Sequence, residues 1–344
     1  MYCESYALWR RPKTAFRSAI FSVTIVSMST KKRLLSGVKP TGRLHLGNYF
    51  GAMKQFVDFR DEYQNFVFVA DYHALTSWHS QKNPEEIRES IKDIVRGYLA
   101  IGLDPQKTTF FQQSKIFEHT ELAWIFDCIT TMPYLMRAHA FKDAEAKNKE
   151  ISVGTFTYPM LMASDILLYD ADVVPVGKDQ QQHVEYARDT AEKFNNLYGE
   201  TFKLPEHMIP EDIATVPGTD GQKMSKSYNN TIPLFGSRNE IEETVMSIVT
   251  DSSGEKPKNV YAIHRLLKSE GELETLYKEN EGKYKAIKEA LIEDLDAMIA
   301  PFREMRAQIT DEDVRKVLEE GNKKAKAVAS AKMKIVREKI GVTV

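Results

Sequence analysis

The sequence predicts an α/β protein in which a doubly wound parallel sheet forms the first domain and an α-helical domain follows it. Two observations lead to this prediction. Short apolar runs alternate with helical patterns as far as Pro233, and such alternation is typical of a parallel sheet covered by helices. Beyond Pro233 only helical patterns follow. We therefore expect one domain over residues 31–233 and a second over residues 234–344.

The first strand is expected at the start of residues 34–51, LLSGVKPTGRLHLGNYFG, where an apolar run breaks at a proline-glycine turn and continues as an amphipathic helix. Asn83-Pro84-Glu85 has the N-cap, proline and acid of a helix start, and that helix should run to about residue 102. Further strands are expected at residues 66–71, 108–112 and 173–176. Further helices are expected at residues 119–130 and 179–198. Residues 131–152 are expected to be an insertion, with a surface or mobile loop at the charged run 142–150.

The second domain is expected to consist of helices at residues 238–248, 260–270, 273–299 and 311–340. We expect interruptions at Pro257, Pro301 and Gly321, because proline and glycine are unfavourable inside helices.

Composition limits the possible functions. The net charge of −2 over 344 residues means that any nucleic-acid contact must come from local patches. The two cysteines, Cys3 and Cys128, are too far apart in sequence to suggest a zinc site or a disulfide framework. This cysteine usage fits a reducing, intracellular setting, and we expect a cytoplasmic location. No stretch reaches transmembrane length, so we expect no membrane association.

Residues 1–30 differ from the rest of the chain. They carry four basic residues before position 18 against the single acid Glu4, and then a run of Ser, Thr and apolar residues. A transit peptide has this composition, which would indicate an organelle. A disordered tail, or a true start at Met28, explains the same segment, and we favour the start at Met28.

The glycine-rich turn within residues 34–51 is a candidate phosphate site, because the N-terminus of the following helix points free N–H groups at it. It is not a P-loop, since Arg43 and Leu44 replace the required Lys and Ser/Thr. The glycine spacing also fails the dinucleotide-binding fingerprint. His45 and Asn48 lie on the first turn of the helix.

A second candidate anion site lies far downstream, at residues 223–227. Two lysines and two hydroxyls follow the turn-forming segment PGTDG at residues 217–221. A solvated basic loop is the alternative interpretation.

A third candidate site lies at residues 158–183. Tyr158, Met162 and Asp165 share one helix face at spacings of i, i+4 and i+7. The first two residues can be explained by core packing alone, but a buried carboxylate needs a hydrogen-bond donor, which a ligand N–H could supply. Downstream, Gly177 and Asp179 mark a strand-to-helix junction, where Asp179 could accept from ribose hydroxyls or act as a plain N-cap.

These motifs carry a family resemblance. His45-Leu46-Gly47-Asn48 resembles the first signature of the class I aminoacyl-tRNA synthetases, and KMSKS at residues 223–227 matches the second letter for letter. With ADYHALT, TYPMLMASDILLY and VVPVGKDQQQH, the chain from residue 31 onward resembles the tryptophanyl-tRNA synthetase family of the bacterial or organellar type. The tyrosyl family is the nearest alternative within the fold.

The resemblance implies a Rossmann-like catalytic domain and a tryptophan–tRNA ligase. Such an enzyme activates L-tryptophan with Mg·ATP to tryptophanyl-adenylate and pyrophosphate, and then transfers tryptophan to tRNA(Trp). It also implies a helical domain that binds the anticodon, a homodimer and no structural metal ion. The basic residues within 321–339 would contact tRNA or form an ordinary solvated helix face.

The resemblance also assigns site residues. The catalytic residues would be His45, Asn48, Lys223 and Lys226. ATP would be bound by Lys39, Pro40, Thr41, Gly47, Asn48, Gly177, Lys178, Asp179, Ile213, Lys223, Met224, Ser225, Lys226 and Ser227. Tryptophan would be bound by Asp165, Tyr158, Met162, Gln180 and His73.

Two residues depart from the family pattern. Asn48 replaces the second histidine of the first signature, a change also seen in tryptophanyl members. Lys39 stands where many relatives carry Gln, and our hypothesis is that its charge relaxes the Mg²⁺ requirement. A non-catalytic RNA-binding paralogue and a nucleotidyltransferase without a tRNA partner are the other hypotheses.

Overall fold

The computed structural model describes residues 31–40, 42–76, 83–146, 151–177, 180–208, 216–250 and 256–343. Lys31–Val344 belong to one compact unit. The segment 1–30 lies outside the described residues, as do the predicted ATP-site residues Thr41, Lys178, Asp179 and Ile213.

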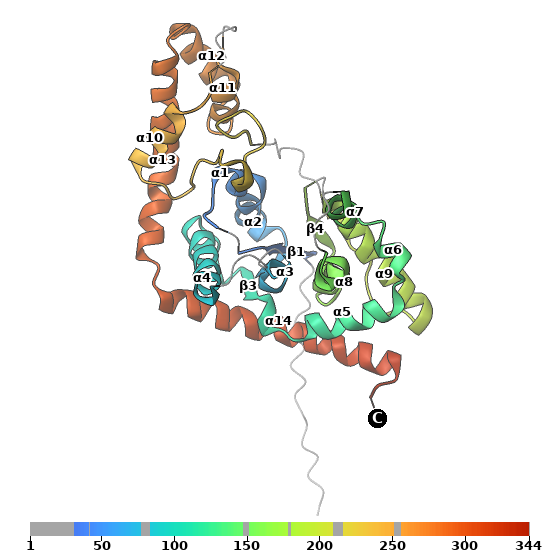
Figure 1. Cartoon of the computed structure of the whole chain (residues 1–344). Coiled ribbons are helices and arrows are strands. Elements are labelled where there is room, and N and C mark those ends of the chain that lie inside the picture. Colours follow the sequence, from blue (N-terminus) through green and yellow to red (C-terminus); the bar gives the residue numbers. More distant parts are fainter. Residues whose placement is uncertain are drawn as a thin grey trace, which may run out of the picture. The chain divides into compact units, whose positions relative to one another are not determined.

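A parallel sheet in the strand order β3-β2-β1-β4-β5 lies at the centre of the described part of residues 31–208 (Figure 1). Its strands are β1 (Arg33–Val38), β2 (Gln64–Val69), β3 (Thr108–Gln112), β4 (Val173–Pro175) and β5 (Glu206–Met208). All neighbouring pairs are parallel, and the chain winds outward from β1 first toward β3 and then toward β5. The predicted doubly wound sheet is confirmed. β5 was not predicted, because Glu-His-Met has no apolar alternation and is a strand only through its pairing with β4.

Helices connect the strands on both faces of the sheet. The helix after β1 is built from α1 (Leu46–Asn48), the π-helical η1 (Tyr49–Met53), α2 (Lys54–Asp58) and η2 (Phe59–Asp61). The longer connections contain α3 (Asp71–Ala74), α4 (Pro84–Ala100), η4 (Gln113–Lys115), α5 (Glu118–Ile129), α6 (Met132–Leu135), α7 (His139–Ala146), α8 (Val153–Leu167) and α9 (Gln181–Tyr198). As predicted, the Asn83 side chain caps α4 by accepting from Glu85 N–H at 3.0 Å. The loop expected from residue 142 is instead helical as far as Ala146, and residues 147–150 lie outside the described residues.

The C-terminal part contains α10 (Arg238–Met246), α11 (Lys258–His264), α12 (Glu270–Glu279), α13 (Tyr284–Gln308) and α14 (Asp311–Ile340). Two predicted helices had wrong limits. α11 ends at His264, and a capping box between Ser269 and Glu272 starts α12. The helix predicted over 273–299 is divided at Gly282, where φ is +74°. Pro301 and Gly321 do not end helices, since they lie inside α13 and α14.

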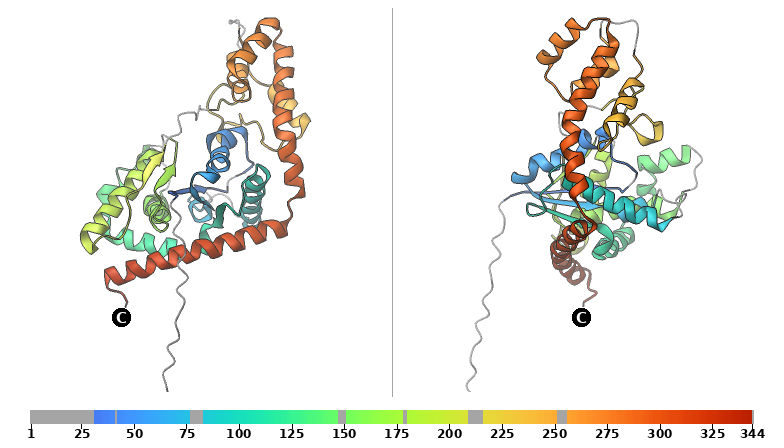
Figure 2. Two further views of the ribbon diagram at one scale, coloured as in Figure 1. Left: turned by 180° about the vertical axis from the view of Figure 1, so that it is seen from behind. Right: turned by 90° about the vertical axis from the view of Figure 1, so that its left-hand side faces the viewer.

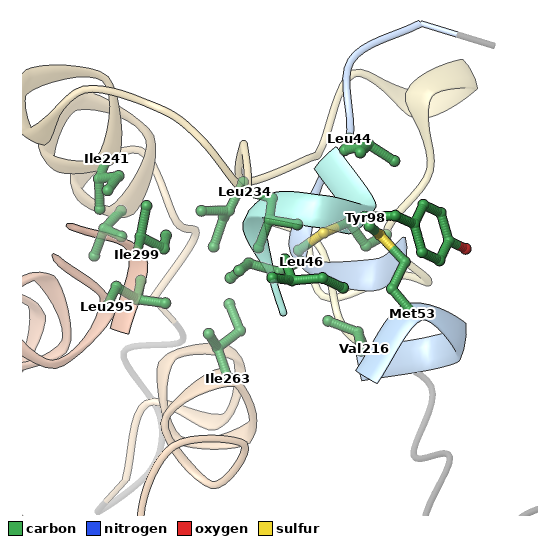
Figure 3. Packing of buried hydrophobic residues seen from close by; sticks show 14 of the residues in the cluster. Leu44, Leu46, Met53, Tyr98, Val216, Leu234, Ile241, Ile263, Leu295 and Ile299 are labelled. Carbon is green, nitrogen blue, oxygen red and sulfur yellow. The ribbon is translucent and has the colours of Figure 1, made fainter. Parts of the chain in front are cut away.

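The sheet buries apolar side chains on both faces, as expected for parallel strands. Along β2, Phe66 and Phe68 enter one cluster while Val67 and Val69 enter the other. The cluster that contains Val67 and Val69 continues into helices α10 to α13. In Figure 3, Leu46 lies in one group with Leu234, Ile263 and Leu295. The helix after β1 and the helices after residue 236 therefore share a core. Within the described residues, no helix is long and apolar enough to cross a membrane.

Helix α14 returns from the C-terminal helices to the sheet and passes along β3 (Figures 1 and 2). The contact is so close that a Cβ atom on Gly321 would lie 1.8 Å from the Phe110 carbonyl oxygen. The side chain of Asn322, the next residue, accepts a hydrogen bond from the Gln112 backbone N–H at 2.9 Å. Glycine in the helix interior is therefore required by the approach of the helix to the strand.

The Gly321→Ala variant should be destabilised by about 1–3 kcal/mol in urea unfolding, because the added methyl group would overlap backbone atoms of β3. The matched control is Gly271→Ala in α12, where a Cβ atom would meet nothing within 4 Å. In an exposed helix position this change should leave stability unchanged or raise it by up to ~1 kcal/mol. Equal effects of the two substitutions would contradict the steric argument.

Candidate active site

The carboxyl ends of β1 and β4 meet where the strand order reverses, which is the place where open α/β sheets bind ligands. Lys39 and Pro40 follow β1, while Gly177 follows β4. Gln180 stands at the N-cap of α9, directly beyond the same end of β4. Four of the predicted site residues thus gather at this edge of the sheet.

Backbone hydrogen bonds join the first signature to the residues just after the second. Leu46 donates its N–H to the Ile232 carbonyl at 3.0 Å, and Leu234 donates to the Leu44 carbonyl at 3.0 Å. His45 and Pro233 form an antiparallel bridge between these two bonds. Segments almost 190 residues apart in the sequence are therefore neighbours.

The lysine loop, which we define as residues 216–230 with the second signature at residues 223–227, lies directly against the first signature. Met224 is buried, and its sulfur accepts a weak hydrogen bond from Gly47 N–H at 3.3 Å. The Lys226 side chain packs over the turn before the helix, since a Cβ atom on Gly42 would lie 3.6 Å from the Lys226 Nζ atom. Ser225 caps the short η6 helix (Lys226–Tyr228), and the Lys223 side chain is exposed.

A cavity of about 240 Å³ opens between β1, the helix after it and α4. Three predicted site residues line it: Lys39, Asn48 and Lys226. Burial by neighbouring atoms lowers the pKa of the Lys39 ammonium group and also of the Lys226 group, where Asp93 partly offsets the effect. The cavity therefore combines two cations with an amide, a combination suited to an anion such as a phosphate.

His45 is neutral in this structure at physiological pH. Burial, reinforced by the nearby charge of Lys226, lowers the pKa of its imidazole to about 4. The side chain is 6% exposed, and its Nδ1 atom has no hydrogen-bond partner within the described part of the chain. A neutral ring can donate or accept a hydrogen bond, but it adds no charge to the site.

Asp165, which is 1% exposed, lies at the centre of a buried polar network on α8. His73 Nε2 lies 2.7 Å from Oδ2, and His119 Nδ1 lies 2.6 Å from Oδ1. The Gln113 amide donates to both oxygens, at 2.8 and 3.0 Å. Burial would raise the pKa of Asp165, but the charges of His73 and His119 and the hydrogen bonds of these two histidines outweigh it and lower the pKa below its usual value. The donors that the sequence argument sought in a ligand are thus supplied by the chain itself.

Gln113, His119 and Tyr169 were not predicted as site residues from the sequence. Tyr169 lies 2.9 Å from His119 Nε2 through its hydroxyl and extends the network. Gln113 and His119 could have been suspected, because they follow the carboxyl end of the strand at residues 108–112. Tyr169, just beyond the end of α8, has no sequence signal that separates it from a core aromatic.

The remaining predicted pocket residues surround this network. The Tyr158 ring meets the His73 ring edge-on at 6.3 Å between centroids, and its hydroxyl is hydrogen-bonded to His183. Met162 lies between Tyr158 and Asp165 on α8 and is partly buried in the adjacent core cluster. Tyr158, His73 and Asp165 are thus brought together, although His73 comes from α3 after β2.

The basic stripe predicted over residues 321–339 lies on α14, but part of it is used within the chain. Lys332 is buried, donates to the Thr201 carbonyl at 2.9 Å and pairs with Asp170 at 2.7 Å. Arg337 pairs with Glu121. The other five basic residues, Lys323, Lys324, Lys326, Lys334 and Lys339, are exposed.

The family follows from comparison with known proteins. The model of the family described as "tRNA synthetases class I (W and Y)" matches residues 28–332, which is most of the chain. The chain belongs to the class I tRNA synthetases. The resemblance seen in the signature motifs is thereby confirmed.

Among the class I tRNA synthetases, the tryptophan–tRNA ligase of Fusobacterium nucleatum is 49% identical over 322 residues, covering 90% of this chain and 98% of that protein. The tryptophan–tRNA ligase of Rhodopirellula baltica is 44% identical over 321 residues, covering 90% and 99%. The crystal structure of the tryptophanyl-tRNA synthetase of Campylobacter jejuni, complexed with ADP and tryptophan, matches with a TM-score of 0.83 at 43% identity. That match covers 90% of this chain and 99% of the other.

Proposed function

We propose that this chain is a tryptophan–tRNA ligase, an ATP-dependent synthetase that activates L-tryptophan and transfers it to the 3′ end of tRNA(Trp). The observation that carries the proposal is the contact of the two signature segments, through Gly47 and Met224, beside the carboxyl ends of β1 and β4. The relatives at 44–49% identity, which are named tryptophan–tRNA ligases, support tryptophan as the amino acid.

In the first step, the tryptophan carboxylate attacks the α-phosphate of Mg·ATP, forming the adenylate and releasing pyrophosphate. Such a reaction depends on positioning and on stabilising the charge of the phosphates. Lys39 and Lys226 supply that charge from the cavity wall, and Lys223 adds to it from the loop. Neutral His45 and Asn48 orient the phosphates by hydrogen bonds. Gly47 lets the adenine approach the backbone, and Gly177 lies at the strand end assigned to the ribose.

Mg²⁺ enters as part of the ATP substrate. The described residues contain no group of three or more His, Cys, Asp or Glu side chains that could hold a metal ion. Magnesium commonly keeps its waters and binds through substrate phosphates instead of a protein cage, so the lysine-lined cavity fits an ion carried by the nucleotide.

Tryptophan binds beside the Asp165 network, with its ring near Tyr158 and Met162 and its amino group near Gln180. The charged Asp165 accepts the indole N–H. Because Asp165 already accepts from His73, His119 and Gln113, the indole must share an oxygen with one of these donors or displace it. A hydrogen-bonding site of this kind can reject an amino acid without the N–H by about 10⁴–10⁵.

The tRNA contacts of the second step belong to the C-terminal helices and to the exposed lysines of α14. The net charge of the whole chain is only −2, so local patches must carry this binding. We place the enzyme in the cytoplasm, or in an organelle if residues 1–30 are a transit peptide.

We also propose a homodimer that buries an apolar patch formed by Trp124, Met132, Met136 and Val153. These side chains are 70%, 67%, 44% and 78% exposed, and they lie on or beside α5, α6 and α8, which pack together. Large exposed apolar side chains gathered on neighbouring elements are typical of a protein interface.

Tryptophan-dependent ATP–pyrophosphate exchange tests the first step. With all twenty amino acids offered, exchange should occur with tryptophan alone, and Asp165→Ala should lower kcat/KM at least about 100-fold because three buried donors lose their acceptor. The control is Asp58→Ala, an exposed carboxylate paired with Lys54, which should remain active. Exchange with tyrosine would overturn the specificity, and no exchange at all would support the RNA-binding paralogue.

The Lys39→Gln variant tests the role of the extra cation in the cavity. Loss of that charge should raise the ATP KM by roughly tenfold and increase the Mg²⁺ concentration needed for half-maximal exchange. Lys107→Gln, which changes an exposed lysine paired with Asp61, is the control. If the ATP KM and the Mg²⁺ dependence were both unchanged in Lys39→Gln, Lys39 would have no part in phosphate binding.

Light scattering after size-exclusion chromatography tests the dimer. The wild type should elute at about twice the chain mass of 39.3 kDa, and Trp124→Lys should shift it toward the monomer because a charge would be buried in the interface. Val249→Lys changes a residue that is 63% exposed outside the patch and should remain dimeric. A monomeric wild type, or a dimer unaffected by Trp124→Lys, would contradict the proposal.

A further inference from the structure

The lysine loop has a buried amide at its base. Residues 216–224 form a small hairpin, in which Met224 N–H donates to the Val216 carbonyl at 2.8 Å and Gly218 N–H donates to the Gln222 carbonyl at 2.7 Å. The chain then passes through η6 and returns to this hairpin at Asn230, which is 2% exposed. Buried amides need hydrogen-bond partners, and each partner of Asn230 belongs to the loop.

The Asn230 side chain makes three hydrogen bonds, one through its oxygen and two through its nitrogen. Oδ1 accepts from the Ser225 backbone N–H at 2.7 Å. Nδ2 donates to the Lys223 carbonyl at 3.1 Å and to the Asp220 carboxylate at 2.8 Å. The orientation of the amide is therefore settled by its neighbours, because the nitrogen faces two acceptors and the oxygen faces a donor.

The Asn230 side chain packs closely against the backbone of Gly218. A Cβ atom on Gly218 would lie 2.3 Å from both Cγ and Nδ2 of Asn230. The Asn230 carbonyl also accepts from Thr219 N–H at 3.0 Å, so its backbone is held as well. An aspartate of the same shape would point a carboxylate oxygen at the Lys223 carbonyl and the Asp220 carboxylate, which is unfavourable.

These bonds act on both sides of Met224. Asn230 holds the backbone of Lys223, which precedes it, and of Ser225, which follows it. Met224 itself contacts Gly47, and Lys226 begins η6 directly after Ser225. Asn230 does not line the cavity in which Lys226 and Lys39 lie, so it reaches the phosphates only through the loop.

We propose that Asn230 is a positioning residue for adenylate formation, which holds the loop so that Lys223 and Lys226 face the ATP phosphates. The proposal rests on the ligase function proposed above. Preorganised charges stabilise a transition state without reorganising during the reaction. Loss of the amide should therefore lower kcat of the activation step, while tryptophan binding at the separate Asp165 network stays unchanged.

The test compares Asn230→Asp, Asp220→Asn and the double variant in tryptophan-dependent ATP–pyrophosphate exchange, with tryptophan affinity from equilibrium dialysis and stability from thermal melting. Asn230→Asp should lower kcat about 10- to 100-fold and leave the tryptophan Kd within about twofold. The double variant should recover part of this loss, because an amide at position 220 can again donate to the side chain at position 230. Asn229→Gly, an exposed neighbour with φ of +50°, should keep wild-type kcat.

Asn230→Ser, which removes the amide without adding charge, serves as the second variant if Asn230→Asp does not fold. Unchanged kcat in a folded Asn230 variant would overturn the proposal. A parallel loss of tryptophan affinity and thermal stability would also overturn it, since Asn230 would then be a general structural residue. If the wild type shows no exchange with any amino acid, the ligase function fails and this proposal fails with it.

Discussion

Two backbone hydrogen bonds, between Leu46 and Ile232 and between Leu234 and Leu44, hold the first signature against the residues just after the lysine loop. Because they join main-chain atoms, they do not depend on the identity of the side chains that carry the chemistry. The apolar side chains of the same residues continue into the core shared with α10 and α13. The lysine loop is consequently attached at its far end through Ile232, while Val216 at its near end is buried in the same core.

The site separates its charges. The cationic side chains Lys39 and Lys226 lie around the cavity at the end of β1, whereas the negative charge of Asp165 lies within a network of α3, α5 and α8. Burial lowers the pKa of Lys39, Lys226 and His45, whereas the charges of His73 and His119 and the hydrogen bonds of these two histidines outweigh burial and lower the pKa of Asp165. One region therefore suits phosphate and the other suits a polar N–H group.

Much of this arrangement could be predicted from the sequence, because it depends on local patterns. The strand at residues 108–112, the cap at Asn83 and the long helix α14 follow from apolar periodicity and from capping residues. The strand β5 could not be predicted in this way, since only its pairing with β4 makes three such residues a strand. The need for glycine at position 321 could not be predicted either. Its helical conformation is open to any residue, and only the close contact with Phe110 explains why no side chain fits there.

The same distinction applies to the candidate site. Lys223, Lys226 and Asp165 stand in recognisable motifs, so the sequence alone assigns them to a site. Gln113, His119 and Asn230 are single polar residues outside such motifs. Most of their hydrogen-bond partners lie at least seven positions away in the sequence, so only the fold reveals these contacts. Residues that hold a functional group in place are in general harder to find from sequence than the group itself.

The contact between α14 and β3 has a further consequence for solubility. β3 is the last strand on its side of the sheet, and such a strand offers unpaired N–H and carbonyl groups to strands of other molecules. Here a helix covers it, and the Asn322 side chain occupies the Gln112 N–H that an added strand would use. The return of the C-terminal helix to the sheet therefore protects this edge against aggregation by strand addition.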